Sequence, residues 1–260
     1  MIFLKLGGSL ITDKSRRETL RLTVLQRLAR EINEALQIKP DLKLLIGHGS
    51  GSFGHPAAEQ SGIQHGVKTQ EEWRGFLDTW AAANRLHRLV MDTLREAGLP
   101  VFSFPPSAMA VADGGGIVAF PDEPIRKALR AGMLPLVQGD VAFDRSRGAT
   151  VLSTEQVMAY LANRLKATRI LLAGVEEGVY ERYPERNRVL PEITTADLSS
   201  VELRGSDAPD VTGGMAQKVE LALELSRLIP GVDVRIFSGN IPGNVQAALL
   251  GYGLGTRVRG

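Results

Sequence analysis

In the segment LKLLIGHGSGSFGHPAAE, residues 42–59, an apolar run opens directly into four glycines and two histidines. Residues 49–54, GSGSFG, match the G-x-G-x-x-G pattern of dinucleotide-binding folds. Such a fold also needs an acidic residue about twenty positions further on, at the end of the next strand. Glu71 and Glu72 stand at that distance, but in a segment with helical period. We therefore interpret the segment as a glycine loop that holds a phosphate on another fold.

Short apolar runs, each bounded by Gly, Pro or Asp, predict the strands of the protein. They cover residues 2–6, 42–47, 101–104, 134–139, 168–174 and 232–239. Segments with helical period, such as 20–36 and 71–97, separate most of them. This alternation predicts an α/β protein, an open αβα sandwich around a mainly parallel central sheet. Residues 141–153 differ, because two strand-like pieces flank a polar turn, and they predict an inserted β-hairpin.

The composition is that of an ordinary globular enzyme, with 260 residues, 43% hydrophobic, 23% charged and a formal net charge of +2. No long basic run is present, so we expect no nucleic-acid partner. The lack of cysteine excludes disulfides, thiolate metal sites and a cysteine nucleophile. The first residues, MIFLKLGG, begin an apolar strand at once, so we expect neither a signal peptide nor a membrane span, and a cytoplasmic protein.

Two further glycine turns carry lysines. Lys5 lies inside an apolar strand that ends at Gly7 and Gly8, where a buried ammonium is costly without an anionic partner. Lys218 follows the second turn, in the first turn of a helix, where the macrodipole disfavours a cation unless an anion is nearby. With Lys14, they form the charge set that phosphoryl transfer needs. The Walker phosphate loop, G-x-x-x-x-G-K-[ST], is absent.

Four motifs in chain order, KLGGSLITDK, GHGSGSFGH, VQGDV and DVTGGMAQK, resemble the amino acid kinase superfamily, and within it the isopentenyl phosphate kinases. The resemblance implies ATP on a C-terminal lobe of about residues 166–260 and a phosphate acceptor on an N-terminal lobe of about 1–165, both parts of one domain. It also implies a small phosphate monoester as substrate and a homodimer. Magnesium would arrive with ATP, held mainly by phosphate oxygens, because no residue spacing predicts a protein metal cage.

The resemblance assigns roles to residues at matching positions. The residues implied in catalysis are Lys5, Lys14, His55, Glu155 and Lys218. Those implied in ATP binding are Lys5, Leu6, Gly7, Gly8, Ser9, Ser50, Gly178, Gly214 and Lys218. Those implied in acceptor binding are Gly49, Gly54, His55 and Gly139.

The sequence departs from its relatives at two places. Relatives commonly carry an aspartate that orients the lysines, whereas the nearest carboxylate here is Glu155, which could also be a plain first-turn helix acid beside Ser153 and Gln156. Near the nucleotide, Glu176 and Glu177 replace the usual acids. We interpret His48 as packing at the loop base, and His87 as a residue on an exposed helix position.

The implied reaction is phosphorylation of isopentenyl phosphate by Mg-ATP. Residues 73–98 can supply an apolar pocket for the acceptor tail, although the same apolar stripe is typical of a plain core. Two alternatives remain open: a fosfomycin-type phosphonate kinase, and a nucleotide- or anion-binding protein without turnover.

Overall fold

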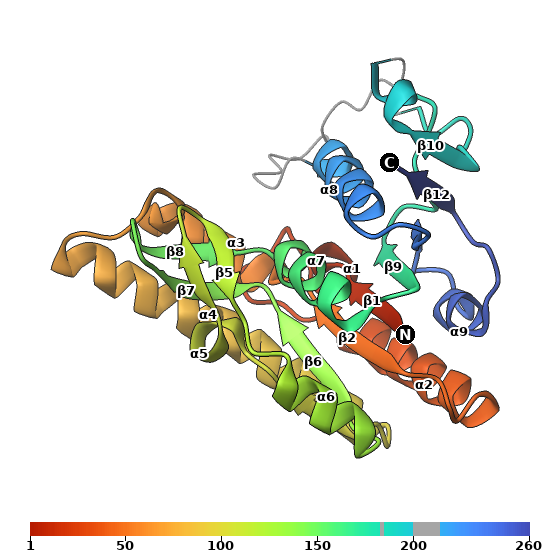
Figure 1. Ribbon diagram of the computed structural model, residues 1–260, viewed down its shortest axis with the longest axis horizontal. Coiled ribbons are helices and arrows are strands. Elements are labelled where there is room, and N and C mark those ends of the chain that lie inside the picture. Colours follow the sequence, from red (N-terminus) through yellow and green to blue (C-terminus); the bar gives the residue numbers. More distant parts are fainter. Residues whose placement is uncertain (183–184, 200–213) are drawn as a thin grey trace.

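The structure is a computed structural model that describes residues 1–182, 185–199 and 214–260. An eight-stranded sheet runs through it, in the order β10-β12-β11-β9-β1-β2-β6-β3 (Figure 1). Its strands are β1 (Ile2–Leu6), β2 (Leu44–His48), β3 (Val101–Ser103), β6 (Leu134–Gln138), β9 (Arg169–Gly174), β10 (Glu192–Thr194), β11 (Asp233–Ser238) and β12 (Thr256–Arg259). All six strands predicted from apolar runs are present.

The six predicted strands pair in parallel, which confirms the mainly parallel sheet. Only the short strands β10 and β12, which the sequence did not predict, run in the opposite direction; β12 pairs antiparallel with β11. β1 lies in the middle, with Lys5 beside Gly47 of β2 and Leu172 of β9. The carboxyl ends of parallel strands share one edge of a sheet, where ligands of such folds bind.

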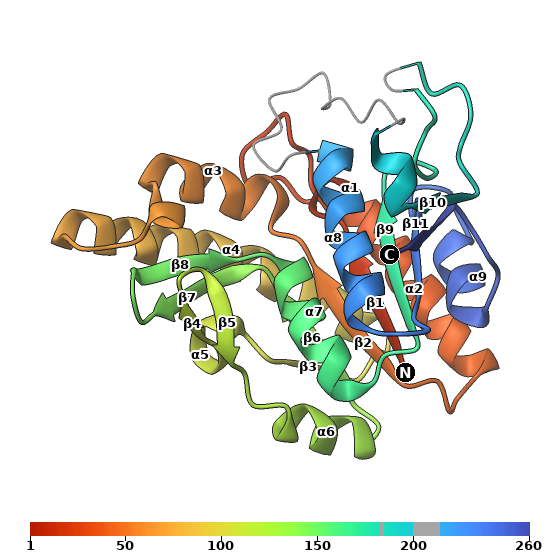
Figure 2. The ribbon, with the colours of Figure 1, turned by 45° about the horizontal axis from the view of Figure 1, so that its top comes forward.

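Helices cover both faces of this sheet, as predicted (Figure 2). The helices are α1 (Gly8–Ile11), α2 (Leu22–Ile38), α3 (Gly51–Ser61), α4 (Gln70–Glu96), α5 (Pro106–Met109), α6 (Glu123–Arg130), α7 (Thr154–Leu165), α8 (Gly214–Leu228) and α9 (Asn244–Leu250), with short 3-10 turns at Ile63–His65 and Thr195–Ser199. Alternate residues of β1 face opposite layers: Phe3 packs in the cluster that includes α7 and α8, and Leu4 in the one that includes α2, α4 and α9.

The predicted hairpin is present as β7 (Asp140–Asp144) and β8 (Gly148–Leu152), which pair antiparallel. It belongs to a second sheet that the sequence did not predict, in the order β5-β4-β7-β8, with β4 (Val111–Asp113) and β5 (Gly116–Ala119). The Asp144 carboxylate accepts hydrogen bonds from the amides of Gly114, Gly115, Ser146 and Arg147, and so fastens the two turns together. Phe143 of β7 packs against Trp73 and Phe76 of α4, which places the small sheet beside that helix. The division into lobes at about residue 165 stays a prediction.

Candidate active site

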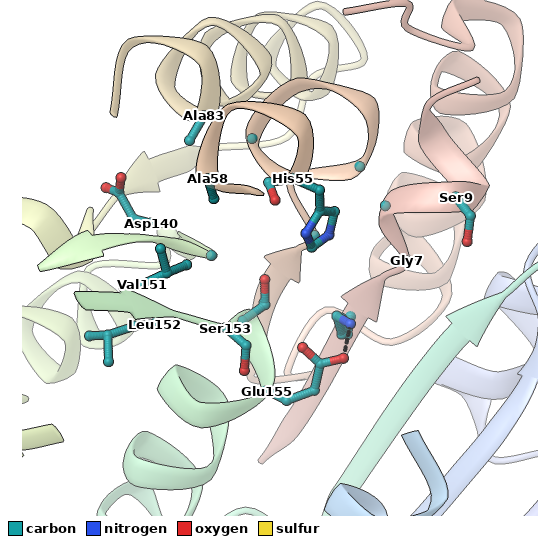
Figure 3. Close-up of a pocket in the computed structure, with 18 of the residues that line it drawn as sticks. Gly7, Ser9, His55, Ala58, Ala83, Asp140, Val151, Leu152, Ser153 and Glu155 are labelled. Carbon is teal, nitrogen blue, oxygen red and sulfur yellow. Dashed lines mark hydrogen bonds and ion pairs between the residues drawn. The ribbon is translucent and has the colours of Figure 1, made fainter. Parts of the chain in front are cut away.

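A cavity of about 380 Å³ opens where β1 and β2 end and where α1, α3 and α7 begin (Figure 3). It gathers side chains and turns from distant parts of the sequence. The predicted site residues that line it are Lys5, Gly7, Gly8, Ser9, Lys14, Gly49, Ser50, Gly54, His55, Gly139, Glu155 and Lys218. Two of the three glycine turns and the three lysines that the sequence singled out therefore share one cavity.

The two glycine turns at the cavity pack backbone against backbone. A Cβ atom on Gly8 would lie 2.6 Å from the amide nitrogen of Gly51, and one on Gly49 would lie 2.8 Å from the amide nitrogen of Gly8. No side chain fits between them. Gly51 also has φ of +49°, a conformation that L side chains rarely adopt. The glycines are needed because the turns after β1 and β2 touch.

Thr12 fastens the same two turns through hydrogen bonds. Its hydroxyl donates to the Gly8 carbonyl (2.7 Å) and accepts from the Ser52 amide (3.0 Å). Among the groups that the structure describes, the amides of Ser50 and Gly51, at the start of α3, donate to no hydrogen-bond acceptor. Two N–H groups at a glycine turn are suited to an anion such as a phosphate.

Lys5 forms an ion pair with Glu155 inside the cavity, drawn as the dashed line in Figure 3. Glu155 lies in the first turn of α7, which begins with a reciprocal capping box between Ser153 and Gln156. Burial raises the pKa of Glu155, but the Lys5 ammonium outweighs it, with a smaller contribution from Lys218, and the pKa falls below its ordinary value. The carboxylate is therefore both a first-turn helix acid and the partner of the buried lysine.

Lys14 lies on a loop, residues 12–21, that is tied to two helices. Pro56 inside α3 has no amide hydrogen, so it cannot donate to the carbonyl of Ser52, four residues earlier. That carbonyl instead accepts the Glu18 amide at 3.0 Å. The Glu18 carboxylate also accepts two hydrogen bonds from Arg85 of α4, at 2.8 and 2.5 Å. The proline in the helix thus leaves an acceptor that anchors the lysine loop.

His55 projects from α3 toward the Lys5 and Glu155 pair (Figure 3). A histidine directly before a proline can cap a helix that begins at the proline, but α3 begins at Gly51 and contains both His55 and Pro56. His55 is therefore an interior helix residue whose side chain lines the cavity, together with Gly54 one position earlier.

Residues 1–238 match the model of the amino acid kinase family. The whole chain is 38% identical over 272 residues to the isopentenyl phosphate kinase of Methanothermobacter thermautotrophicus, across 99% of that protein. The chain belongs to the amino acid kinase family, and within it to the isopentenyl phosphate kinases. The kinase is also 32% identical over 266 residues to the isopentenyl phosphate kinase of Methanocaldococcus jannaschii, with 99% of this chain and 98% of that one covered.

Solved structures of isopentenyl phosphate kinases have the same fold as this kinase. X-ray structures of isopentenyl phosphate kinase match it with a TM-score of 0.83 and 35% identity, over 99% of both chains. A product complex of the Thermoplasma acidophilum isopentenyl phosphate kinase matches with a TM-score of 0.78 and 26% identity, over 100% of both. The open αβα sandwich of the amino acid kinase type is thereby confirmed.

Apolar side chains, among them Ala58, Ala83 and Val151, line the far end of the kinase's cavity beside polar ones. The sequence predicted that residues 73–98 line it, and α4 does contribute Thr79 and Ala83. Lining residues that were not predicted include Ala58, Glu59, Gln64, Asp140, Val151 and Leu152. Burial raises the pKa of Asp140, although its carboxylate accepts hydrogen bonds from Ser107, Gln138 and Val141. The period-2 pattern of residues 148–152 was the available signal, but it does not indicate which side faces a ligand.

Two predicted site residues, Leu6 and Gly178, do not line the cavity. The Leu6 side chain is in the core, and its carbonyl accepts the Gly49 amide at 3.0 Å. Gly178 packs against Thr256 and Val189, where a Cβ would come within 2.6 Å of both side chains. Gly214 is the first residue of α8, and its surroundings, like those of Gly213, lie outside what the structure describes. Their parts in nucleotide binding stay predictions.

The kinase differs from the sequence interpretation at His87. This residue was expected at an exposed helix position, but it is only 5% exposed and hydrogen-bonds to His48. Helical period alone placed it on the wrong face, because its polar partner comes from a strand 39 residues earlier. No helix in the described ranges combines the length and apolar character that a membrane crossing needs.

The anchoring of the Lys14 loop can be tested at Arg85. We expect Arg85→Ala to lower kcat about two- to fivefold, because an exposed ion pair contributes roughly 0.2–1 kcal/mol and the loop would be held less firmly. The charge-reversed pair Glu18→Arg with Arg85→Glu should recover part of the loss. Arg88→Ala is the control, since Arg88 pairs along its own helix with Asp92. Equal kcat values for the Arg85→Ala and Arg88→Ala variants in steady-state assays would contradict the anchor.

Proposed function

We propose that this protein transfers the γ-phosphoryl group of ATP to isopentenyl phosphate, giving isopentenyl diphosphate and ADP. The proposal rests chiefly on one observation: full-length relatives named isopentenyl phosphate kinase share this fold, and the cavity of this chain joins a glycine cradle, three lysines and an apolar end. Kinase relatives imply ATP as the phosphate donor. Residues of about 1–165 would hold the acceptor and those of about 166–260 the ATP.

The chemistry brings two anions together, so charge neutralisation is the main task of the protein. Lys5, Lys14 and Lys218 line the same cavity and would surround the moving phosphoryl group. Glu155 would act through Lys5 as a positioning residue, since the ion pair holds the ammonium on β1. Gly7, Gly8, Ser9 and the Ser50 side of the loop would lie against the ATP phosphates.

Magnesium would enter with ATP and be held mainly by phosphate oxygens. Within the described part of the chain, no group of three or more His, Asp or Glu residues gathers in a way that could hold a metal ion. We propose that the ion is bound as a metal–nucleotide pair and not by a protein site of its own. The ion would supply further neutralisation of the phosphate charge.

The acceptor phosphate would be held by Gly49, Gly54, Gly139 and His55, with its hydrocarbon tail directed to the apolar end of the cavity. A histidine at this place can donate a hydrogen bond to a phosphate oxygen, and it would position the acceptor rather than act as a nucleophile. The walls formed by Ala58, Ala83 and Val151 favour an apolar tail over a small polar phosphonate. This favours isopentenyl phosphate over fosfomycin.

Two further parts of the proposal concern the oligomeric state and the cellular location of the enzyme. We propose a homodimer; β3 is an open edge of the large sheet, and its Phe102 is 54% exposed. Sedimentation velocity would test this, and a monomer at micromolar concentration would contradict it. The cytoplasmic location expected from the sequence stays a prediction.

The reaction is tested by incubating the protein and Mg-ATP with a panel of acceptors and measuring ADP release. We expect turnover with isopentenyl phosphate at a kcat/KM at least about tenfold above that with fosfomycin, because one to three kcal/mol is typical for filling an apolar pocket. A preference for fosfomycin would make the phosphonate alternative correct. ATP binding without ADP release from any acceptor would make the protein a non-catalytic binder.

The lysines are tested by substitution. We expect Lys5→Ala and Lys218→Ala to lower kcat by about 10²-fold or more with smaller effects on the acceptor KM, because the charge acts mainly in the transition state. Lys5→Ala leaves Glu155 buried without its partner, so the double variant with Glu155→Gln separates lost folding from lost catalysis. Lys127→Ala, on the exposed face of α6, is the control. A change in KM alone would refute a catalytic role.

His55 is tested by two substitutions that differ in hydrogen bonding. His55→Gln keeps a donor and should retain appreciable activity. His55→Ala should lose most of the activity with isopentenyl phosphate while the melting temperature changes little, because the side chain lines the cavity. A large fall in melting temperature combined with a normal kcat/KM would instead make His55 a structural residue.

A further inference from the structure

Behind the glycine loop, two buried histidines and the half-buried Ser103 form a row that the proposed chemistry does not use. His48, at the end of β2, has Nδ1 at 3.1 Å from the carbonyl oxygen of Gly49 and Nε2 at 2.9 Å from Nδ1 of His87. Nε2 of His87 lies 2.6 Å from the hydroxyl of Ser103, in β3. The row therefore joins the edge strand of the sheet, the long helix α4 and the glycine loop.

The direction of the hydrogen bonds in this row follows from the group at its end, the carbonyl of Gly49. A carbonyl oxygen only accepts, so Nδ1 of His48 must carry the proton. Burial lowers the pKa of His48 to about 4 and that of His87 to about 3, so both rings are neutral near pH 7. Nε2 of His48 then accepts from Nδ1–H of His87, and Nε2 of His87 accepts from the Ser103 hydroxyl. Both rings hold their proton on Nδ1.

One competing arrangement is available to His87. Gln138 also approaches its ring, and Oε1 of Gln138 is buried with no partner among the described residues. A proton on Nε2 of His87 could satisfy that oxygen. In that arrangement His48 would donate from Nε2 to His87, and its bare Nδ1 would face the Gly49 carbonyl, two acceptors at 3.1 Å. The Gly49 carbonyl would then lose its donor.

The held carbonyl determines where the next amide points. In a planar trans peptide the C=O and the following N–H point in opposite directions. The Gly49 carbonyl points back to His48, so the Ser50 N–H points away from the row. Ser50 lines the cavity, and its amide donates to no group in the described part of the chain. The amide of Gly49 itself is already bonded to the Leu6 carbonyl, so the peptide between Gly49 and Ser50 is the one left to be oriented.

We propose that Ser103, His87 and His48 form a one-directional hydrogen-bond relay that positions the glycine loop by holding the Gly49 carbonyl and thereby aims the Ser50 amide at a phosphate oxygen. His48 and His87 are positioning residues, since neither lines the cavity. The relay extends the proposed function and rests on it for its kinetic consequences. Its hydrogen-bond direction stands on the structure alone.

The direction of the relay is tested by ¹⁵N NMR of histidine-labelled protein at pH 7. The sequence holds only four histidines, and the His87→Asn variant assigns the signal of His87 by its loss. We expect His48 and His87 each to carry the proton on Nδ1. A proton on Nε2 of either ring, or a charged ring, would overturn the relay, whatever the protein catalyses.

The positioning role is tested by comparing two substitutions of His87. In His87→Asn the side-chain amide nitrogen can take the place of Nδ1 and donate to His48, whereas His87→Leu has no donor. We expect His87→Leu to lower kcat with isopentenyl phosphate at least about tenfold, since displacement of reacting groups by about 1 Å can cost 10²-fold. His87→Asn should stay within about threefold of wild type, as a donor is retained.

Thr93→Val is the matched control for stability. Thr93 is a buried polar residue of α4, six positions after His87, that bonds within its own helix to the Leu89 carbonyl. It should lower the melting temperature without changing kcat. If His87→Leu and His87→Asn are equally impaired, or if both behave as Thr93→Val does, the relay is wrong. Wild-type protein without kinase activity would instead reject the proposed function and leave the NMR result to judge the relay.

Discussion

The direct contact between two backbone turns is the constraint on which the site depends. The turn after β1 and the turn after β2 approach so closely that Cβ atoms on Gly8 and Gly49 would overlap the opposite backbone. Parallel pairing of β1 with β2 brings the turns to the same edge, and Thr12 bonds them together. A surface of bare amides results, which is the surface that a phosphate can approach closely.

The buried position of Lys5 depends on residues at the same edge of the sheet. A lysine on a central strand is tolerated because α7 begins beside it and directs Glu155 at its ammonium. Thr154, the first residue of α7, donates to the His48 carbonyl at 2.7 Å, so the carboxylate and the glycine loop have a common anchor. A buried ion pair of this kind is kept for placement more than for stability, because desolvation offsets much of the attraction.

The sequence predicted those features of the fold and the site that depend on local residue patterns. Apolar runs identified the six parallel strands, and the glycine and lysine spacing identified most of the cavity lining. Contacts between segments distant in the sequence could not be predicted from these patterns. The period of α4 could not reveal that His87 faces His48, and a three-residue run such as β4 is too short to distinguish from a loop. Glu155 was identified as the nearest carboxylate, but its pairing with Lys5 across 150 residues required the fold.

One methyl group added where the turns touch would show whether their contact creates the site. Gly49→Ala should destabilise the protein by roughly 1–3 kcal/mol in urea unfolding, as overpacking does, and lower kcat/KM for isopentenyl phosphate at least about tenfold. Gly116→Ala, at an exposed strand position where a Cβ meets nothing closer than 3.7 Å, should change stability by about 0.5 kcal/mol or less and leave activity unchanged. If the Gly49→Ala protein matches the Gly116→Ala protein in both measurements, the contact between the turns does not create the site.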